Sequence, residues 1–445
     1  MQQDYRGLRQ DEELEMVADP RFIPREGRTD DPHSSLSLDE RDRRWNATRT
    51  EMEKRGIDCL YIVGRGNNEN GNTRWLDNGD YSERYLIFPR KGNPIILWAL
   101  PIWERWYKQN SWEGCEFRAN YNSPSIAAAQ AISDLGYGKG KIGIVGLIGE
   151  GLNPEGTIPY MTFQNLKSQL PAAQFCDASD LLMRLRMFKS AEELRMIEKA
   201  SELANIEFDA LIRHARPGIR ESELAAEVVY ASLKAGNELG RDHWFIMCSG
   251  KTGFPVNRRP TDKILRSGEL ILTGNYTRFG GYWAHPHYAI SLGKLDEEYQ
   301  PMREAVREAT QIALSLLKPG TPWEEIDRKI DEPILAGGYY HEITQIHCVG
   351  LDGIEPPTTC LVRGNVPAKR FPLKGSLADN EEYRQFRGSG AGIMQDLVVQ
   401  PGMAVALEVK AVKDDRIFIE FGPQVIVTEA GARVLNPMAL DVVEL

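Results

Sequence analysis

The feature that most constrains the fold is an internal repeat in the second half of the chain. The segment ARPGIRESELAAEV, which begins at Ala215, is echoed by LKPGTPWEEIDRKI, which begins at Leu317. Each copy places a Pro-Gly turn between two segments that carry apolar residues at helical spacing, and strand-like segments follow each copy. Two helix-helix-strand-strand halves of similar size predict an α+β domain with approximate twofold symmetry.

The first part of the chain follows a different pattern. CLYIVG at 59–64 and KIGIVGL at 141–147 are short apolar runs typical of buried strands, and residues 85–100 predict a hairpin around the turn KGNP. Apolar residues at helical spacing in 39–55 and 123–135 predict helices before and between these strands. The alternation of helix and strand predicts a small α/β domain with a mixed sheet.

Charge and composition exclude several classes of partner. The net charge of -10 and the pI near 5.4 argue against binding to nucleic acid or to an anionic membrane. No run approaches the ~20 apolar residues of a membrane-spanning helix, and the acidic first segment lacks the apolar core of a secretory signal. The cysteines form no CxxC pair, which favours reduced thiols. We therefore expect a cytoplasmic protein with a small-molecule substrate.

Several motifs occur in an order typical of one known family. R-x-R-x-x-K-S-x-x-E-L occupies 184–194, Gly-Tyr occupies 281–282, His-x-x-Gly-Leu-Asp occupies 347–352 and Pro-Gly-Met occupies 401–403. Upstream, NGDYSERYLIFPRKG at 78–92 resembles the amino-terminal domain of creatinase. Together these motifs resemble the pita-bread family, which includes aminopeptidase P, prolidase and creatinase.

The resemblance implies an α/β + α+β fold with two domains. An amino-terminal arm at 1–40 precedes a creatinase-like N-terminal domain at 41–180, and a C-terminal pita-bread catalytic domain follows at 181–445. An insertion at about 355–395 stands where relatives run a short loop. The resemblance also implies a homodimer.

The metal ligands of this family are only partly present. In its metallopeptidases, two aspartates, one histidine and two glutamates hold two divalent metals. The resemblance assigns the histidine to His347 and the glutamates to Glu408 and Glu420, but the aspartate positions fall at 274–275 and at His285. An imidazole cannot replace a carboxylate that bridges two close cations. We therefore expect a branch with substituted ligands and no dinuclear site.

Two interpretations of the remaining residues stay open. In one, His285, His347, Glu408 and Glu420 hold a single divalent metal, for which zinc, iron and manganese are suitable. In the other, no metal is bound, and His285, His287 and His347 perform acid–base chemistry beside the two glutamates. The likeness to creatinase, which also lacks the aspartates, favours the second interpretation, so we expect no cofactor.

Other residues are candidates for substrate binding. Tyr282 and Trp283 lie close to His285 in sequence, although aromatic residues at such spacings are more often part of a core. Arg363 and Arg370 belong to the insertion, which carries turn signals and basic residues. Because long loops in compact domains are usually functional or disordered, we expect a lid or substrate-gripping loop there.

The leading function predicted from these residues is a small-molecule hydrolase of the creatinase type, which cleaves a C–N bond by histidine and glutamate acid–base chemistry. The first alternative is a lyase of the same superfamily, which combines proton abstraction with elimination or C–C cleavage. Two further alternatives are an Xaa-Pro peptidase with a mononuclear metal site and a non-catalytic binding module.

Overall fold

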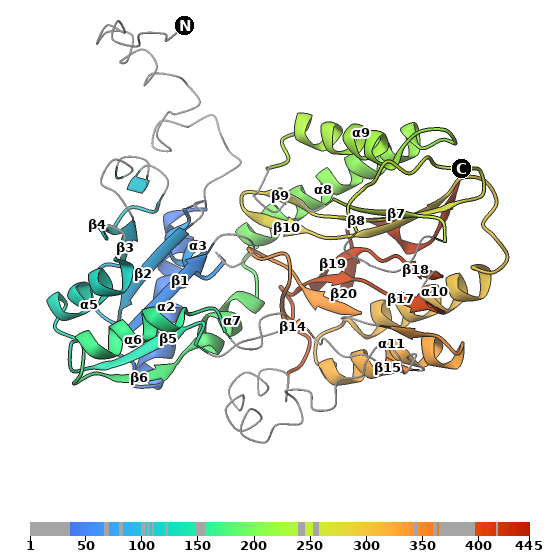
Figure 1. The fold of residues 1–445 in the computed structure, drawn as a ribbon. Helices are drawn as coiled ribbons and strands as arrows, with labels where there is room; N and C mark the ends of the chain where they lie inside the picture. Colours follow the sequence, from blue (N-terminus) through green and yellow to red (C-terminus); the bar gives the residue numbers. More distant parts are fainter. Residues whose placement is uncertain are drawn as a thin grey trace, which may run out of the picture.

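The computed structural model of this chain describes residues 36–65, 71–79, 83–98, 104, 107–108, 111–120, 123–147, 156–238, 245–251, 258–341, 345–358, 363–364, 397–414 and 417–445. These residues form two parts, each with its own sheets and helices (Figure 1). Of the predicted arm, residues 1–35 lie outside the described residues, and the first described helix already begins at Leu38.

The first part is built on a six-stranded mixed sheet with the strand order β4-β3-β2-β1-β5-β6. Strand β1 pairs antiparallel with β2 and parallel with β5. Leu60 and Ile62 join one hydrophobic core, whereas Cys59, Tyr61 and Val63 join another. Because both faces of this strand are covered, its sequence is continuously apolar rather than alternating. The elements are α2 (Leu38–Lys54), β1 (Cys59–Arg65), α3 (Gly71–Asp77), β2 (Glu83–Pro89), β3 (Ile95–Trp98), β4 (Glu116–Ala119), α5 (Pro124–Asp134), β5 (Lys141–Val145), α6 (Tyr160–Gln169), β6 (Gln174–Asp177) and α7 (Ser179–Met187).

The second part contains the two helix pairs that the repeat predicts. Helices α8 (Ala191–His214) and α9 (Glu221–Lys234) form one pair, and α10 (Gln300–Leu316) and α11 (Trp323–Ala336) form the other. Each Pro-Gly turn ends on a glycine with positive φ, +94° at Gly218 and +90° at Gly320, a conformation that glycine adopts without strain.

The strands of the second part form separate small sheets between these helix pairs. One sheet has the order β21-β11-β8-β7, a second has β15-β12-β17-β18, a third has β14-β13-β16-β19-β20, and β9 pairs with β10. The strands are β7 (Phe245–Ser249), β8 (Leu270–Asn275), β9 (Thr277–Phe279), β10 (Tyr282–Ala284), β11 (His287–Ser291), β12 (Tyr340–His341), β13 (Ile346–Cys348), β14 (Glu355–Thr358), β15 (Arg363–Gly364), β16 (Ala404–Leu407), β17 (Lys410–Val412), β18 (Phe418–Glu420), β19 (Gln424–Thr428), β20 (Gly431–Val434) and β21 (Val443–Glu444), with the short 3-10 helix η7 at Pro437–Leu440.

Each helix pair packs its apolar face on a sheet. Phe208 of α8 shares a core with Ile271 of β8, and Val306 of α10 shares a second core with Ile419 of β18. In Figure 1 the first helix pair lies along one side of the strands and the second pair lies along the other. The sheets are therefore enclosed between helices, so polar residues at their strand ends are withdrawn from water.

A buried ion-pair group joins the two parts of the chain; we call it the junction cluster, and it consists of Arg186, Lys189, Asp352 and Glu355. The Arg186 guanidinium group pairs with both carboxylates, and Nζ of Lys189 lies 3.0 Å from Oε2 of Glu355. The backbone N–H of Gly71 donates to Asp352 at 3.1 Å. These contacts fix the first part against the sheet that carries β13 and β14.

No helix in the described part of the chain combines the length and the apolar character that crossing a bilayer requires.

Candidate functional site

Five polar residues singled out from the sequence come together at strand ends in the second part. His285 lies between β10 and β11, His287 begins β11, His347 lies in β13, Glu408 lies between β16 and β17, and Glu420 ends β18. All five are buried, with at most 4% of their surface exposed. The proline between the two neighbouring histidines breaks the strand there, as expected of a residue that cannot donate to a sheet ladder.

Three imidazoles converge on one carboxylate oxygen. Oε1 of Glu408 lies 2.6 Å from Nε2 of His285, 3.0 Å from Nε2 of His347 and 3.4 Å from Nε2 of His287. The Nε2 atoms of His285 and His287 are themselves 2.8 Å apart. We call these four residues the histidine–glutamate cluster.

The other ring nitrogen of each histidine faces an oxygen atom. Nδ1 of His347 lies 2.7 Å from the carbonyl oxygen of the following residue, and Nδ1 of His285 lies 3.3 Å from the carbonyl oxygen of Asn275. Nδ1 of His287 lies 3.5 Å from Oε1 of Glu420. A proton on Nδ1 satisfies these oxygens and leaves the Nε2 lone pair directed at Glu408, which is the arrangement usual for metal-ligating histidines.

With a proton on each Nδ1, the Nε2 electron pairs and the carboxylate of Glu408 meet with no proton between them. His285, His287 and Glu408 each offer one ligand atom, and these atoms all lie within 4.8 Å of one another. Imidazole and carboxylate are ligands of zinc, iron and manganese, and three protein ligands leave a coordination position open for catalysis. The residues present therefore fit one divalent cation, with His347 against the same carboxylate oxygen.

The electrostatics of the cluster agree with metal-ligating protonation states. Burial and the neighbouring His287 lower the pKa of His285 to about 3, so its imidazole is neutral near pH 7. Burial by itself raises the pKa of Glu408, but the positive charge of Lys410, together with the adjacent imidazoles, outweighs burial and holds this pKa well below its ordinary value. Neutral imidazole and ionised carboxylate are the forms that bind metals.

Gly274, in the region where the family pattern expects the first aspartate, lies opposite His287. Gly274 of β8 pairs with His287 of β11 in the sheet register. A Cβ atom at Gly274 would lie 2.9 Å from Cε1 of the imidazole, closer than real Cβ atoms approach their neighbours. The imidazole therefore fills the space that a side chain at this position would need. At the next position, Nδ2 of Asn275 donates to Oε2 of Glu207 at 2.6 Å.

Sequence reasoning missed Lys410, whose side chain is fully buried within the site. Its Nζ lies 2.8 Å from Oε1 of Glu420 and 3.3 Å from Oε2 of Glu408. The signal was available, because a lysine inside the apolar run AVALEVKAV is rarely buried without an acidic partner.

The structure differs in two respects from the mononuclear ligand set expected from the family pattern. Glu420 is engaged by the Lys410 ammonium group and is absent from the group of ligand atoms within 4.8 Å, whereas His287 belongs to that group. His347 contacts Glu408 but lies outside the group as well. A dinuclear site does not fit these residues, because an ammonium group stands between the two glutamates.

The two predicted substrate-binding residues whose side chains the structure describes, Tyr282 and Trp283, make their contacts outside the cluster. The Tyr282 hydroxyl accepts from Arg44 at 2.7 Å and donates to Glu193 at 3.0 Å, within a buried network. The Trp283 ring packs edge-on against Tyr276 at 6.1 Å between centroids. The structure describes the backbone of Arg363 in β15, and Arg370 lies outside the described residues, as does most of the predicted insertion.

A second residue that sequence reasoning missed is Tyr276. Its ring stacks on the imidazole of His285, with the ring centroids 3.6 Å apart. This contact limits rotation of the imidazole and fixes the direction of its Nε2 lone pair. Nothing in the sequence around Tyr276 signals that role.

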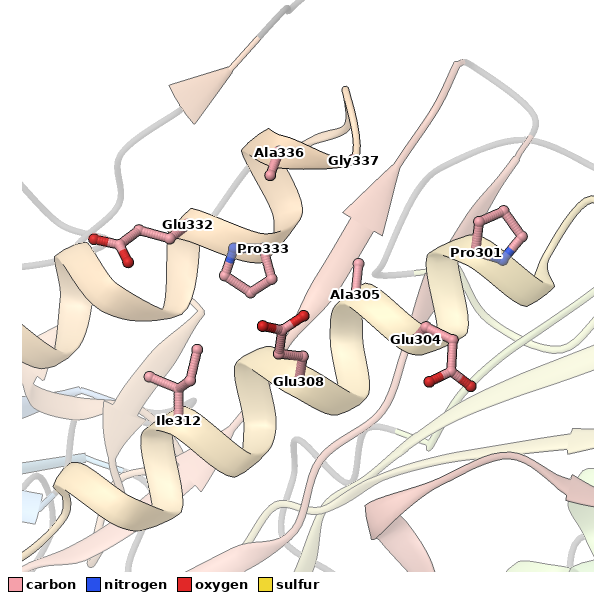
Figure 2. Close-up of a pocket in the computed structure, with 9 residues that line it drawn as sticks. All are labelled: Pro301, Glu304, Ala305, Glu308, Ile312, Glu332, Pro333, Ala336 and Gly337. Atoms are coloured by element: carbon pink, nitrogen blue, oxygen red, sulfur yellow. The ribbon is translucent and has the colours of Figure 1, made fainter.

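The groove between α10 and α11 shares no residue with this site. Figure 2 shows three glutamates along it, Glu304, Glu308 and Glu332. Glu304 pairs with Arg307 on its own helix, and Glu332 pairs with Arg328 and Lys329. Such intrahelical pairs are typical of a solvated helix surface.

Comparison with known families supports the architecture. Residues 44–188 match the Creatinase/Prolidase N-terminal domain, and residues 195–429, more than half of the chain, match Metallopeptidase family M24. An Xaa-Pro dipeptidase of Pyrococcus furiosus is 30% identical over 210 residues, which are 47% of this chain and 60% of that protein. A creatinase of a Bacillus species is 22% identical over 313 residues, 67% of this chain and 71% of that protein. The match thus spans less than two thirds of the first relative.

Solved structures share the fold. An Xaa-Pro dipeptidase from Bacillus anthracis superposes with a TM-score of 0.71 at 20% identity, covering 91% of this chain and 100% of that chain. An X-Pro aminopeptidase from Thermotoga maritima gives a TM-score of 0.72 at 17% identity, covering 90% of this chain and 99% of that chain.

These comparisons confirm the predicted pita-bread family and the two-domain fold class. The prediction of an enzyme agrees with relatives whose names are those of enzymes. The expectation that no cofactor is bound is wrong, because the matched family is one of metallopeptidases. The expectation rested on the likeness to creatinase, which also lacks the aspartates. That expectation gave the missing aspartates more weight than the metallopeptidase character of the family.

Proposed function

The chain belongs to metallopeptidase family M24, and we propose that it hydrolyses a C–N bond of a small molecule, with one divalent cation held by His285, His287 and Glu408. The family membership and the relatives named as dipeptidase and creatinase support a hydrolase. The substituted ligands support a centre with one cation rather than two.

The observation that carries this proposal is the convergence of three Nε2 atoms on one carboxylate oxygen. Nε2 of His285 stands 2.8 Å from Nε2 of His287 and 2.6 Å from Oε1 of Glu408. With a proton on each Nδ1, as the facing oxygens favour, the buried Nε2 and carboxylate electron pairs repel one another unless a cation is shared among them.

The cation and the protein's own residues would each contribute to the reaction. A divalent cation at this position supplies positive charge that polarises a carbonyl group next to the scissile bond. The stacked ring of Tyr276 and the carbonyl of Asn275 hold the His285 imidazole in one orientation and one tautomer. His347, whose Nε2 lies 3.0 Å from Oε1 of Glu408, is placed to accept or return a proton.

The second candidate is an Xaa-Pro dipeptidase, favoured by the relative at 30% identity. None of the relatives named above is called a lyase or a binding protein. The predicted homodimer and cytoplasmic location stay predictions.

Metal analysis and substrate screening of the purified full-length chain test the proposal together. The protein is stripped with chelator, dialysed against Zn²⁺, Mn²⁺ or Fe²⁺, and measured for metal per chain by mass spectrometry. Turnover is then followed with Xaa-Pro dipeptides and with creatine-like guanidino acids. We expect about one metal per chain and metal-dependent release of an amine or urea from one of these classes.

A matched pair of histidine variants makes the test specific. His285→Ala should lose the metal and at least about 100-fold in turnover, since it removes a ligand from the centre. His214→Ala, at the end of α8 and outside the cluster, should behave as the unmodified protein. Equal metal content and turnover in both variants would refute the proposed centre.

A further inference from the structure

We propose that the ammonium group of Lys410 is a built-in cation that takes the place of a second metal ion and fixes this centre at one metal per chain. This inference rests on the proposed function, because it concerns the same centre. It assigns a role to a buried lysine that the proposed chemistry does not otherwise use.

The contacts of Lys410 are those of a cation held between two anions. Its side chain is 0% exposed, and the two carboxylates beside it are 4–5% exposed. Nζ lies 2.8 Å from Oε1 of Glu420 and 3.3 Å from Oε2 of Glu408. Two buried carboxylates this close would repel each other strongly without a positive charge between them.

The two oxygen atoms of Glu408 face different groups. Its Oε1 atom faces the imidazoles of His285 and His347, whereas its Oε2 atom faces Lys410. A carboxylate that bridges two metals uses its oxygens in the same way. Here one side of the bridge is suited to a divalent cation, and the other side already has an ammonium group.

The backbone holds Lys410 in this position. Lys410 pairs with Glu420 across β17 and β18, so their side chains stand side by side. Gln345 clamps the lysine backbone, accepting from its N–H at 2.8 Å and donating to its carbonyl oxygen at 3.3 Å. Gln345 is itself 1% exposed. These contacts fix the backbone from which the buried lysine side chain extends toward the two glutamates.

The residues on the side of the centre away from Lys410 also favour a single metal ion. A tightly bound second metal would use a further carboxylate, which the pattern of the family places at 274–275. A side chain at Gly274 would collide with His287, as its Cβ atom would stand 2.9 Å from the imidazole. The chain thus lacks a ligand on one side and supplies a cation of its own on the other.

Metal titration of the unmodified protein, one test variant and one control variant tests this role. The protein and its Lys410→Ala and Lys413→Met variants are stripped of metal and then dialysed against excess Zn²⁺ or Mn²⁺. Metal per chain is measured by mass spectrometry, and the unfolding temperature is recorded with and without metal. Lys413 directly follows β17, is exposed, and pairs with Glu298.

We expect the unmodified protein and Lys413→Met to saturate at one metal per chain. Lys410→Ala frees two carboxylates and should take up a second, weaker equivalent, and excess metal should raise its unfolding temperature more than that of the unmodified protein. One metal in Lys410→Ala with no such gain would overturn the inference and leave the proposed function standing. No metal in the unmodified protein would overturn both.

A double variant keeps the test decisive if Lys410→Ala does not fold. Lys410→Met with Glu420→Gln removes both charges of the pair at nearly constant volume. If the ammonium group serves Glu420 as a cation, this variant should still bind one metal at an affinity within about threefold of the unmodified protein. Loss of that metal would show that Glu420 is a ligand and would overturn the inference. Two metals bound by the unmodified protein would overturn it as well.

Discussion

The junction cluster and the histidine–glutamate cluster are both buried groups of ionisable side chains, but they differ in how their charges are matched. At the junction, Arg186 and Lys189 face Asp352 and Glu355, so two cations meet two anions. At the site, Lys410 is the one cation that the structure describes against two glutamates, and three imidazoles add lone pairs.

The difference separates a structural cluster from a functional one. Burial of ions costs free energy unless every charge has a partner, and the junction meets that condition with its own side chains. The histidine–glutamate cluster and Lys410 do not meet that condition with their own side chains, so a bound cation is needed to balance the remaining negative charge. Both clusters are withdrawn from water, so the feature that points to chemistry is the surplus of anionic and acceptor groups over cations at the site.

We expect the largest effect on stability from a substitution that removes a cation from the junction cluster. Arg186→Met removes the cation that serves both Asp352 and Glu355, and leaves two buried carboxylates with Lys189 alone. The free energy of unfolding should fall by about 3–5 kcal/mol, as measured by urea denaturation. The exposed Arg184→Met variant should change it by less than about 1 kcal/mol. Metal binding by the folded Arg186 variant should be unchanged; a coupled loss would contradict the separation of the two clusters.

The pH dependence of stability should distinguish a buried carboxyl that has a cation from one that has none. Burial raises the pKa of Glu207 to about 7, because its partners Ser232 and Asn275 are neutral. At the junction, Arg186 and Lys189 outweigh burial and lower the pKa of Glu355 to about 2. Glu207 therefore stabilises the fold below its unfolded value of 4.5 and loses that contribution as pH rises through about 7.

Urea denaturation between pH 4.5 and 7.5 measures this contrast. Glu207→Gln should gain stability relative to the unmodified protein as pH rises, by on the order of 3 kcal/mol over the range. Glu355→Gln should stay less stable by a constant amount, since its contribution is lost only below about pH 4.5, as the carboxyl is protonated on the way to its folded pKa of about 2. Parallel curves for the two variants would contradict the difference.

Metal should stabilise the site and leave the junction unaffected. A ligand at 100 times its dissociation constant adds about 2.7 kcal/mol to the free energy of unfolding. That gain should appear in the unmodified protein and in Arg186→Met, and it should vanish in His287→Ala. Thermal unfolding with chelator or with added Zn²⁺ measures it. A gain retained by His287→Ala would show that the metal binds elsewhere.

The fold was predictable because its signals are local and repeated. The Pro-Gly turns at 217–218 and 319–320 mark both helix pairs, and Ser190 with Glu193 forms the capping box that begins α8. Apolar runs such as 59–64 identified buried strands. These patterns depend on neighbours in sequence, and such neighbours are present before any tertiary contact is known.

The site was only partly predictable because its partners are distant in sequence. His285, His347, Glu408 and Glu420 were found by the order of motifs. Lys410 was missed, because its pairing with Glu420 depends on the register of β17 and β18. The expectation of no metal is wrong for a different reason, the match to a metallopeptidase family. The contact between Gly274 and His287 could not be predicted from the sequence either, because it depends on the pairing of β8 and β11.

The smallest effect should come from filling that space. In Gly274→Ala the new methyl group would stand 2.9 Å from Cε1 of His287, so the imidazole must shift. We expect a loss of about 1–3 kcal/mol in stability, as for other overpacked sites, and weaker metal binding. Gly138→Ala is the control, since its methyl group meets Oγ of Ser133 at 3.3 Å on a surface turn. Urea denaturation of both variants measures the loss of stability, and metal titration measures the change in metal affinity. If Gly274→Ala lost stability but kept its metal affinity, His287 would be a packing residue and the three-ligand centre would be wrong.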